Sequence, residues 1–240
     1  MPGAMIVLVV VVGVALVGVV AYLAHKAEVQ RREGLAALAA ELGWTFEPAR
    51  DRGFDEEHAQ FGVFRRGHSR AALNTMRGRL AVGPREHGGR MGDFEYKITT
   101  SSGKSTRTRT IRTSYIVVRP AFPRLPDLLI RRETVLDKLA GAIGFDDIDF
   151  ESSEFSRKFH VKSRDKRFAY DVVHPRMMEF LLADPGLGVD IEGGCVLVCG
   201  DRGRWTPAEF RVRLEWVRRF LELWPEHVAS ELEGKGAARA

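Results

Sequence analysis

The stretch that decides the fold runs from Phe94 to Val118 and reads FEYKITTSSGKSTRTRTIRTSYIVV. The Gly-Lys-Ser-Thr in its middle matches the end of a Walker A phosphate loop, G-x-x-x-x-G-K-[ST]. Counting back from Gly103, however, places Ile98 where the first glycine of that motif must stand. The residues that follow alternate with period two and are rich in Thr, Ile and Val, whereas a phosphate loop must lead into a helix. The sequence therefore predicts a β-hairpin, with strands at 94–100 and 106–118 and a turn at 101–104.

An uncharged apolar run near the N-terminus, Met5–Ala24, reads MIVLVVVVGVALVGVVAYLA. A helix of this length spans about 30 Å, which is the thickness of the hydrocarbon core of a bilayer. No Lys or Arg precedes the run, and it is longer than the core of a signal peptide, so an uncleaved anchor is favoured over a cleaved leader. Lys26, Arg31 and Arg32 follow the run. The positive-inside rule then predicts a single-pass protein of the cell membrane with its N-terminus outside and a cytoplasmic C-terminal domain.

The hairpin has an unusual concentration of positive charge. Arg107 and Arg109 share one face of the return strand, Lys104 lies at the turn, and Arg112 continues the series. One interpretation is a solvated edge whose basic residues prevent pairing with other chains. The other is a finger that binds anions, and on a membrane-tethered domain the nearest anions are lipid headgroups. These four residues are therefore the candidate anion- or lipid-binding site; no specific nucleic acid is expected, because the strand lacks interleaved aromatic residues.

The rest of the 240-residue chain predicts an α+β domain behind the anchor. Short segments rich in aromatic and β-branched residues follow one another from Trp44 to about Ile130 with no helical run between them, which indicates an antiparallel sheet. Helices packed on that sheet are predicted at Glu133–Ile143, from Pro175, and from the capping box at Thr206. The expected organisation is a transmembrane anchor (1–25), a juxtamembrane helix (26–43), a soluble domain (44–228) and a flexible tail (229–240).

Three further local predictions concern strands. AQFGVFRRG (59–67) reads as a strand between turns, and Phe155, Phe159 and Val161 indicate a strand that turns at SRDK into RFAYDVV. GVDIEG and CVLVCG predict a hairpin closed by Gly193 and Gly194.

The cysteines and the acidic residues do not form a recognisable metal site. Cys195 and Cys199 lie four residues apart, about 13 Å along a strand, which is too far for a disulfide. They are expected as buried thiols in a reducing compartment, the alternative being half of a metal site. The acidic run (Asp146, Asp147, Asp149, Glu151) does not follow the EF-hand order, so a solvated loop is expected rather than a cation site. No cofactor or metal is predicted.

The seven histidines show no metal-binding or nucleophile-activating spacing. A hydrolase or transferase with an unrecognised site remains an alternative, and it would use His174, Asp171 or His160. That alternative predicts a pocket in which these side chains converge with shifted pKa values.

A segment of the second half, IDFESSEFSRKFHVKSRDKRFAYDVVHPRMMEFLL, resembles a family of uncharacterised bacterial single-span membrane proteins. Members pair an N-terminal apolar span with one soluble part, and the resemblance extends over Leu35–Val228. It implies no catalytic residue and places Phe155, Phe159 and Phe168 in the core. The expected function is a membrane-anchored, non-catalytic binding or scaffolding domain with a protein partner that the sequence does not identify; a homo-oligomer is compatible with it. The alternatives are the hydrolase or transferase and an anionic-lipid sensor that uses the basic hairpin.

Overall fold

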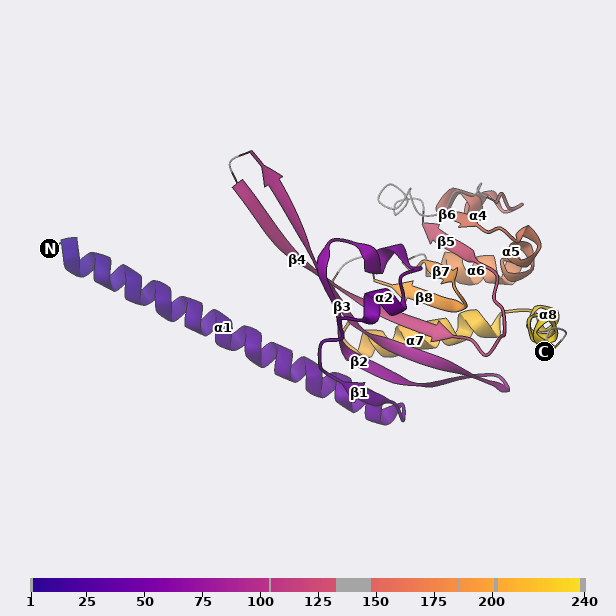
Figure 1. The fold of residues 1–240 in the computed structure, drawn as a ribbon, viewed down its shortest axis with the longest axis horizontal. Coiled ribbons are helices and arrows are strands. Elements are labelled where there is room, and N and C mark those ends of the chain that lie inside the picture. The colour runs from indigo at the N-terminus through magenta and orange to yellow at the C-terminus, as the bar shows by residue number, and fades with distance from the viewer. Residues whose placement is uncertain (1, 104, 133–147, 185, 201–202, 238–240) are drawn as a thin grey trace.

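The computed structural model describes residues 2–103, 105–132, 148–184, 186–200 and 203–237. A long helix, α1, leaves a compact domain on one side, and a β-hairpin also projects beyond the body of that domain (Figure 1). The predicted helix Glu133–Ile143 lies outside the described residues. The helices after α1 (Pro2–Glu41) are α2 (Phe54–Glu57), a 3-10 helix (Gly62–Arg65), α4 (Ser153–Lys158), α5 (Lys166–Val172), α6 (Pro175–Ala183), α7 (Pro207–Glu222) and α8 (Glu226–Ala237).

Eight strands form one antiparallel sheet in the order β1-β2-β3-β4-β8-β7-β5-β6. Consecutive strands β1 to β4 pair as a meander, as expected where no helix separates them along the chain. The α+β fold class, an antiparallel sheet with helices packed on it, is confirmed. The strands are β1 (Thr45–Glu47), β2 (His68–Val82), β3 (Arg85–Ser102), β4 (Ser105–Arg119), β5 (Leu128–Arg132), β6 (Phe159–Lys162), β7 (Val189–Glu192) and β8 (Cys195–Cys199).

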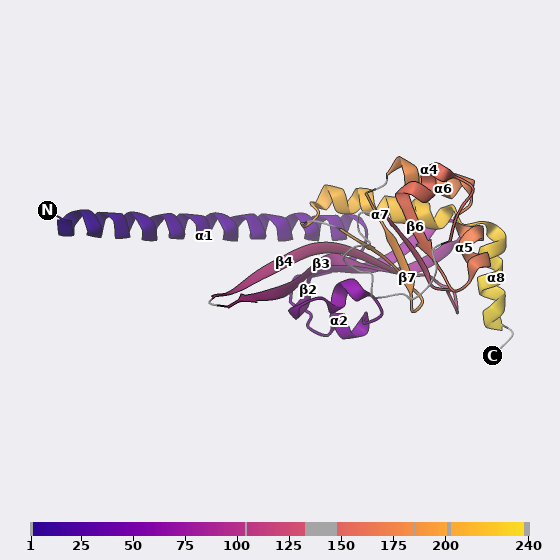
Figure 2. The same ribbon diagram turned by 90° about the horizontal axis from the view of Figure 1, so that it is seen from above.

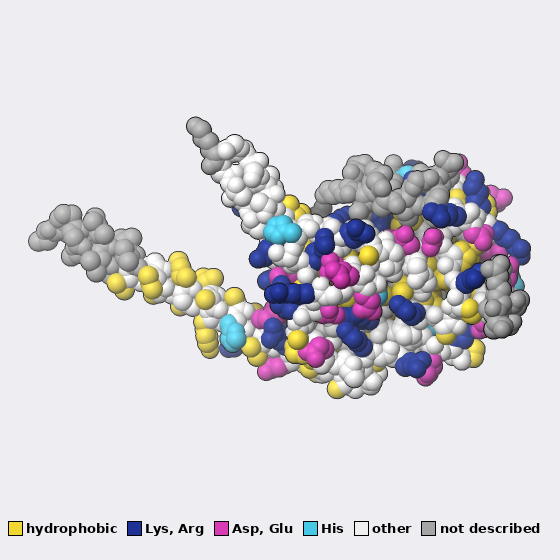
Figure 3. Space-filling model, in the orientation of Figure 1, with side chains coloured by type: hydrophobic (Ala, Val, Ile, Leu, Met, Phe, Trp, Pro, Cys, Tyr) yellow, Lys and Arg dark blue, Asp and Glu magenta, His cyan; other side chains and the backbone are white. Residues whose placement is uncertain are grey.

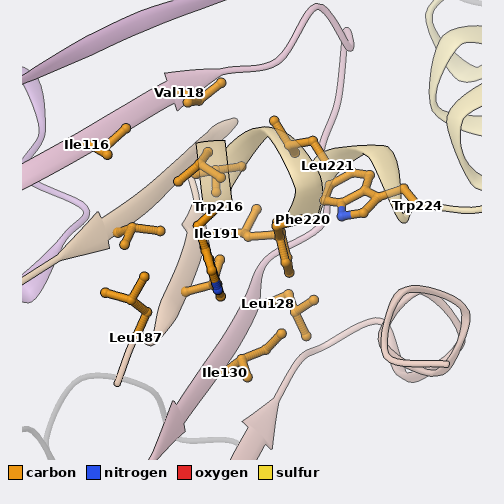
Figure 4. Close-up of a cluster of buried hydrophobic side chains, with 14 of the residues drawn as sticks. Ile116, Val118, Leu128, Ile130, Leu187, Ile191, Trp216, Phe220, Leu221 and Trp224 are labelled. Atoms are coloured by element: carbon orange, nitrogen blue, oxygen red, sulfur yellow. The ribbon is translucent and has the colours of Figure 1, made fainter. Parts of the chain in front are cut away.

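The two faces of the sheet are covered by different layers, because alternate residues of a strand point to opposite faces. Ile116 and Val118 of β4 join the main core, where Trp216, Phe220 and other residues of α7 pack on the sheet (Figure 4). The alternate residues of the same strand, Tyr115 and Val117, point to the other face and join a second cluster under α2 and the 3-10 helix. Figure 2 shows α2 and α7 on opposite sides of the strands.

The two hairpins and the helix cap that the sequence predicts are confirmed. The return of β3 into β4 is a hairpin whose closing pair is Ser102 and Ser105. β7 and β8 form the second predicted hairpin, with positive φ at both Gly193 and Gly194. α7 begins with the full capping box, in which the Thr206 side chain and the N3 glutamate exchange hydrogen bonds with each other's backbone N–H groups.

Two of the predicted strands are wrong in whole or in part. Residues 59–67 form turns and the 3-10 helix instead of a strand, because Phe61 and Phe64 both pack into the second cluster. Phe155 lies in α4, which Ser152 caps by accepting a hydrogen bond from the Phe155 N–H at 3.2 Å. Only residues 159–162 of that predicted strand are extended, and RFAYDVV is helical as most of α5.

The flexible tail expected from residue 229 is also corrected. The chain continues as α8 to Ala237, and Val228, Ala229 and Leu232 are buried. Pro225 ends the preceding helix as predicted, but the residues after it have apolar positions one turn apart that return to the core. Short helices of this kind depend on tertiary packing more than on intrinsic propensity.

Candidate functional site at the base of α1 and the β3–β4 hairpin

Residues 11–24 of α1 make no contact that would bury them. Residues 11–24 are all exposed, including large apolar side chains such as Val14, Val17 and Leu23. Among the residues that the structure describes, α1 is the one helix that is both long enough and apolar enough to cross a membrane. Exposed apolar surface on this scale is unfavourable in water and favourable in lipid. The helix therefore suits a membrane anchor.

The C-terminal half of α1 is fixed to the domain by a buried carboxylate. Asp93 of β3 is fully buried, and the guanidinium of Arg31 donates to it from Nε at 3.0 Å and from Nη2 at 2.7 Å. Ser114 Oγ donates to the same carboxylate at 2.8 Å and Asn74 Nδ2 at 3.1 Å. A buried charge is tolerated when it is paired and hydrogen-bonded in this way.

The same network reaches the segment before α7. Glu28 of α1 accepts from Arg204 at 2.7 Å and from Asn74 at 3.3 Å. The Trp205 backbone N–H donates to Ser114 Oγ at 2.9 Å. Polar groups from α1, β2, β3, β4 and the chain before α7 thus share one cluster, which fixes the direction in which α1 leaves the sheet.

A β-bulge in β2 places Asn74 in this cluster. Its backbone has φ of 51°, and the register of β2 on β3 shifts between Leu73 and Met76, as at a β-bulge. Gly92 lies opposite on β3, where an added Cβ would approach the Asn74 carbonyl oxygen to 2.9 Å. The missing side chain at Gly92 therefore lets the bulge close over Asp93.

Further along the same two strands, the Glu95 carboxylate pairs two arginines. It accepts from Arg50 Nη2 and from Arg112 Nε, both at 2.6 Å. Burial by itself raises the pKa of Glu95, but the hydrogen bonds from Arg50 and Arg112 outweigh burial and hold the pKa below its ordinary value. Arg112 therefore has a counterion inside the protein, which sets it apart from the other candidate anion-binding residues.

The distal part of the hairpin has free positive charge. Arg107 lies opposite Thr100 and Arg109 opposite Ile98, and both arginines are exposed. Within the part of the chain that the structure describes, no ion pair involves either of them. The fourth candidate, Lys104, lies outside the described residues.

The other face of the ribbon is a row of hydroxyl groups. Thr99 and Thr108 are hydrogen-bonded across the strands at 2.9 Å, and Ser101 and Thr106 at 3.1 Å. His68 Nε2 contacts Thr99 Oγ1 at 3.0 Å near the base of this row. These cross-strand pairs hold the ribbon together where no core covers it.

The candidate residues of the hydrolase or transferase alternative line different hollows. His174 lines a cavity of about 320 Å³ beside the end of α7, where its Nε2 contacts the Leu223 carbonyl oxygen at 2.9 Å. Asp171 lines another of about 130 Å³ and lies within ion-pair distance of Arg167 and His227. His160 is on β6, opposite Arg131. The structure thus assigns the three residues to separate surroundings.

Cys195 is buried and Cys199 is half-buried, and the two do not form a disulfide. Burial raises the pKa of the Cys195 thiol, which disfavours the reactive thiolate. In the acidic run, Asp149 and Glu151 are exposed, while Asp146 and Asp147 lie outside the described residues. No group of three potential metal ligands occurs among the residues that are described.

No motif in the sequence marks the Asp93 cluster. Its members come from five separate stretches, and only the fold brings Glu28 and Arg31 to Asp93 and Arg204. The available signal is indirect: Glu28 and Arg31 are three positions apart, so they lie on neighbouring positions of one helix face just after the apolar run.

No family model matches this chain, and no curated protein matches it. Among solved structures it is similar to the crystal structure of the mycobacterial trehalose monomycolate transport factor A, TtfA, with a TM-score of 0.50 and 13% sequence identity. The match covers 82% of this chain and 95% of that chain. At this identity the likeness shows a shared fold, and it assigns no role to any residue of this chain.

Proposed function

We propose that this chain is a single-span membrane protein whose cytoplasmic domain is a non-catalytic binding or scaffolding module. The observation that supports this most directly is the continuity of α1. Its exposed apolar half leads without a break into a half whose Arg31 is held by the buried Asp93. An anchor joined by a flexible linker would leave the domain free to rotate, whereas this one presents it in a set orientation. A set orientation suits a module that docks on a neighbour in the same membrane.

The surroundings of the candidate acid–base residues favour binding over turnover. A general acid–base pair must lie within hydrogen-bond reach of the same substrate atoms. His174 and Asp171 line separate hollows, and the raised pKa of Cys195 disfavours a thiolate nucleophile.

The fold likeness supports a more specific version of the proposal. The similar protein is a mycobacterial transport factor. We infer an accessory role for this chain beside a transport apparatus of a bacterial cell membrane, with a membrane protein as its partner.

The test uses the full chain in membranes of its native host. A photo-crosslinking residue is placed at exposed positions of the domain, and a compartment-sensitive reporter is fused after Ala240. We expect a cytoplasmic reporter signal and a discrete adduct with a transport protein. A matched chain, in which residues 5–24 are replaced by an unrelated apolar helix, should keep the adduct if the domain makes the contact.

The same purified full chain is assayed on ester, phosphoester and glycoside substrates. Turnover that falls when His174 is changed to Ala would contradict the non-catalytic proposal. A reporter signal outside the cytoplasm would contradict the topology.

A further inference from the structure

The β3–β4 hairpin and the apolar half of α1 leave the domain on the same side. In Figure 1 both extend away from the body of the sheet, and in the perpendicular view of Figure 2 they still extend in the same direction. Because Arg31 is bound to Asp93, helix and ribbon diverge from one fixed point.

Measured from the Arg31–Asp93 pair, the ribbon is longer than the stretch of helix between that pair and the apolar run. Ala24, the end of the apolar run, lies seven residues from Arg31, or about 10 Å along a helix. Ser102 lies nine residues from Asp93, or about 30 Å along a strand. Arg109, opposite Ile98, is about 17 Å along. The distal part of the ribbon is therefore long enough to reach a bilayer that surrounds the apolar run (Figure 1).

The charge of the ribbon changes at the place where it leaves the domain. At Glu95 and Arg112 its charges are still paired inside the protein. Beyond that pair, residues 96–111 contain no acidic residue. The described basic residues in this interval are Lys97, Arg107 and Arg109. The face visible in Figure 3 likewise shows no acidic side chain on the projecting ribbon.

The composition of the distal ribbon suits headgroups and not hydrocarbon. Apart from Ile98, the described residues between 97 and 110 are Thr, Ser, Gly, Lys and Arg. Their hydroxyl and guanidinium groups are costly in the bilayer core but well placed among phosphates.

We propose that the β3–β4 hairpin docks on the bilayer that holds α1, with Arg107 and Arg109 binding the phosphates of anionic lipid headgroups. The inference rests on the proposed anchoring by α1 and goes beyond it. Helix and hairpin then form two separate membrane contacts, which set the tilt of the domain on the membrane and make it sensitive to the anionic lipid content of the leaflet.

The test uses the full chain in lipid nanodiscs of phosphatidylcholine alone or of phosphatidylcholine with phosphatidylglycerol. Hydrogen–deuterium exchange is followed in peptides that cover residues 97–110. We expect slower exchange of these amides in the anionic discs, and the difference should vanish in 1 M salt, where the Debye length is about 3 Å. Each basic residue near an anionic surface contributes about 1 kcal/mol. The double variant Arg107→Gln and Arg109→Gln should therefore shift the docking equilibrium by roughly 30-fold, which is about 2 kcal/mol at tenfold per 1.4 kcal/mol.

The matched control removes two exposed basic residues elsewhere, Arg157→Gln with Lys166→Gln in α4 and α5. It has the same net charge as the test variant and should keep the protection of the hairpin. Exchange that is equal in the two kinds of disc, or equally protected in the test variant, would overturn the proposal, as would protection that appears only when a protein partner is added. A chain that does not enter discs at all would instead contradict the anchoring by α1, so the two failures are distinguishable.

Discussion

The base and the tip of the β3–β4 hairpin are made from the same two strands in one register, yet their environments are opposite. The pairing continues without a shift from Gly88–Arg119 to Ser102–Ser105. At the base both faces are covered, and the acidic groups Asp93 and Glu95 are bound by arginines. At the tip both faces are exposed, and Arg107 and Arg109 have no described counterion. Backbone pairing therefore forms the ribbon, whereas the layers above and below it decide which part is core and which part is surface.

The aromatic residues show the same division. Phe64 of the 3-10 helix packs edge-on against Phe94 and Tyr115 at the base, with ring centroids 4.8 Å and 5.6 Å apart. Burial raises the pKa of Tyr115 to about 12. No aromatic residue occurs in residues 97–114, so the second cluster ends where the ribbon leaves the domain.

The largest expected effect comes from breaking the base at Asp93. Changing Asp93 to Ala leaves Arg31 without its buried counterion, and removing one partner of a buried pair costs about 3–5 kcal/mol. The free energy of unfolding of the full chain in detergent, followed by circular dichroism, measures this loss. Asp149→Ala, at an exposed position, is the control and should stay within about 0.5 kcal/mol of the parent. A loss below 1 kcal/mol at Asp93 would show that the cluster does not hold α1.

A smaller effect is expected at Glu95, where the base gives way to the tip. Glu95→Gln removes the carboxylate that binds Arg50 and Arg112, both of which stay half-exposed to water, so we expect a loss of about 1–2 kcal/mol. Since the pKa of Glu95 is lowered in the folded protein, its contribution is present above the unfolded pKa and is lost as the pH falls. Denaturation at neutral and acid pH should show the variant approaching the parent in acid. A difference that does not depend on pH would contradict the assignment.

His58, which is buried beside the second cluster on the covered face of the base, provides a further test of the comparison. It is buried beside Phe54 and Phe64, and burial lowers its pKa below the ordinary 6.5. The unfolded chain therefore binds this proton more readily, and stability that is present above pH 6.5 is lost as the pH falls toward the lower folded pKa. The slope from one proton is at most about 1.4 kcal/mol per pH unit. His58→Leu should flatten the dependence of the unfolding free energy on pH just below 6.5, whereas an unchanged slope would assign the titration to other groups.

The smallest effect on stability is expected at the tip. Arg107→Gln with Arg109→Gln removes exposed side chains that have no described partner, so the unfolding free energy in detergent should change by less than about 0.5 kcal/mol. Thermal denaturation of the double variant beside the parent measures this. A loss above 1 kcal/mol would mean that the arginines stabilise the fold, and the comparison of base with tip would fail.

Several parts of the fold could be predicted because their signals are local. The Thr206 capping box, the Gly193–Gly194 turn and the Gly103 turn each depend on residues a few positions apart. The prediction failed at Phe61, Phe64 and Phe155, where aromatic residues are equally suited to a strand or to a short helix until a surface exists to bury them. The tail after Val228 failed for the same reason, because a short helix needs a core to pack on.

Of the candidate site, the sequence predicted only the exposed basic residues at the tip of the hairpin. Arg107 and Arg109 could be found because a run of basic residues without acidic neighbours is visible in one dimension. Arg112 could not be told apart from them, since its counterion Glu95 comes from the opposite strand. The roles of Lys104 and of the arginines in binding anions stay predictions.

The sequence by itself determined the apolar length of α1, the hairpin at Gly103, the antiparallel α+β class and the excess of positive charge on the ribbon, because each depends on near neighbours or on composition. Only the tertiary structure decided that Arg31 and Asp93 join α1 to the sheet and that helix and hairpin leave the domain on one side. The physical reason is that a buried charge must be paired wherever the fold places it, and the partner can come from any part of the chain.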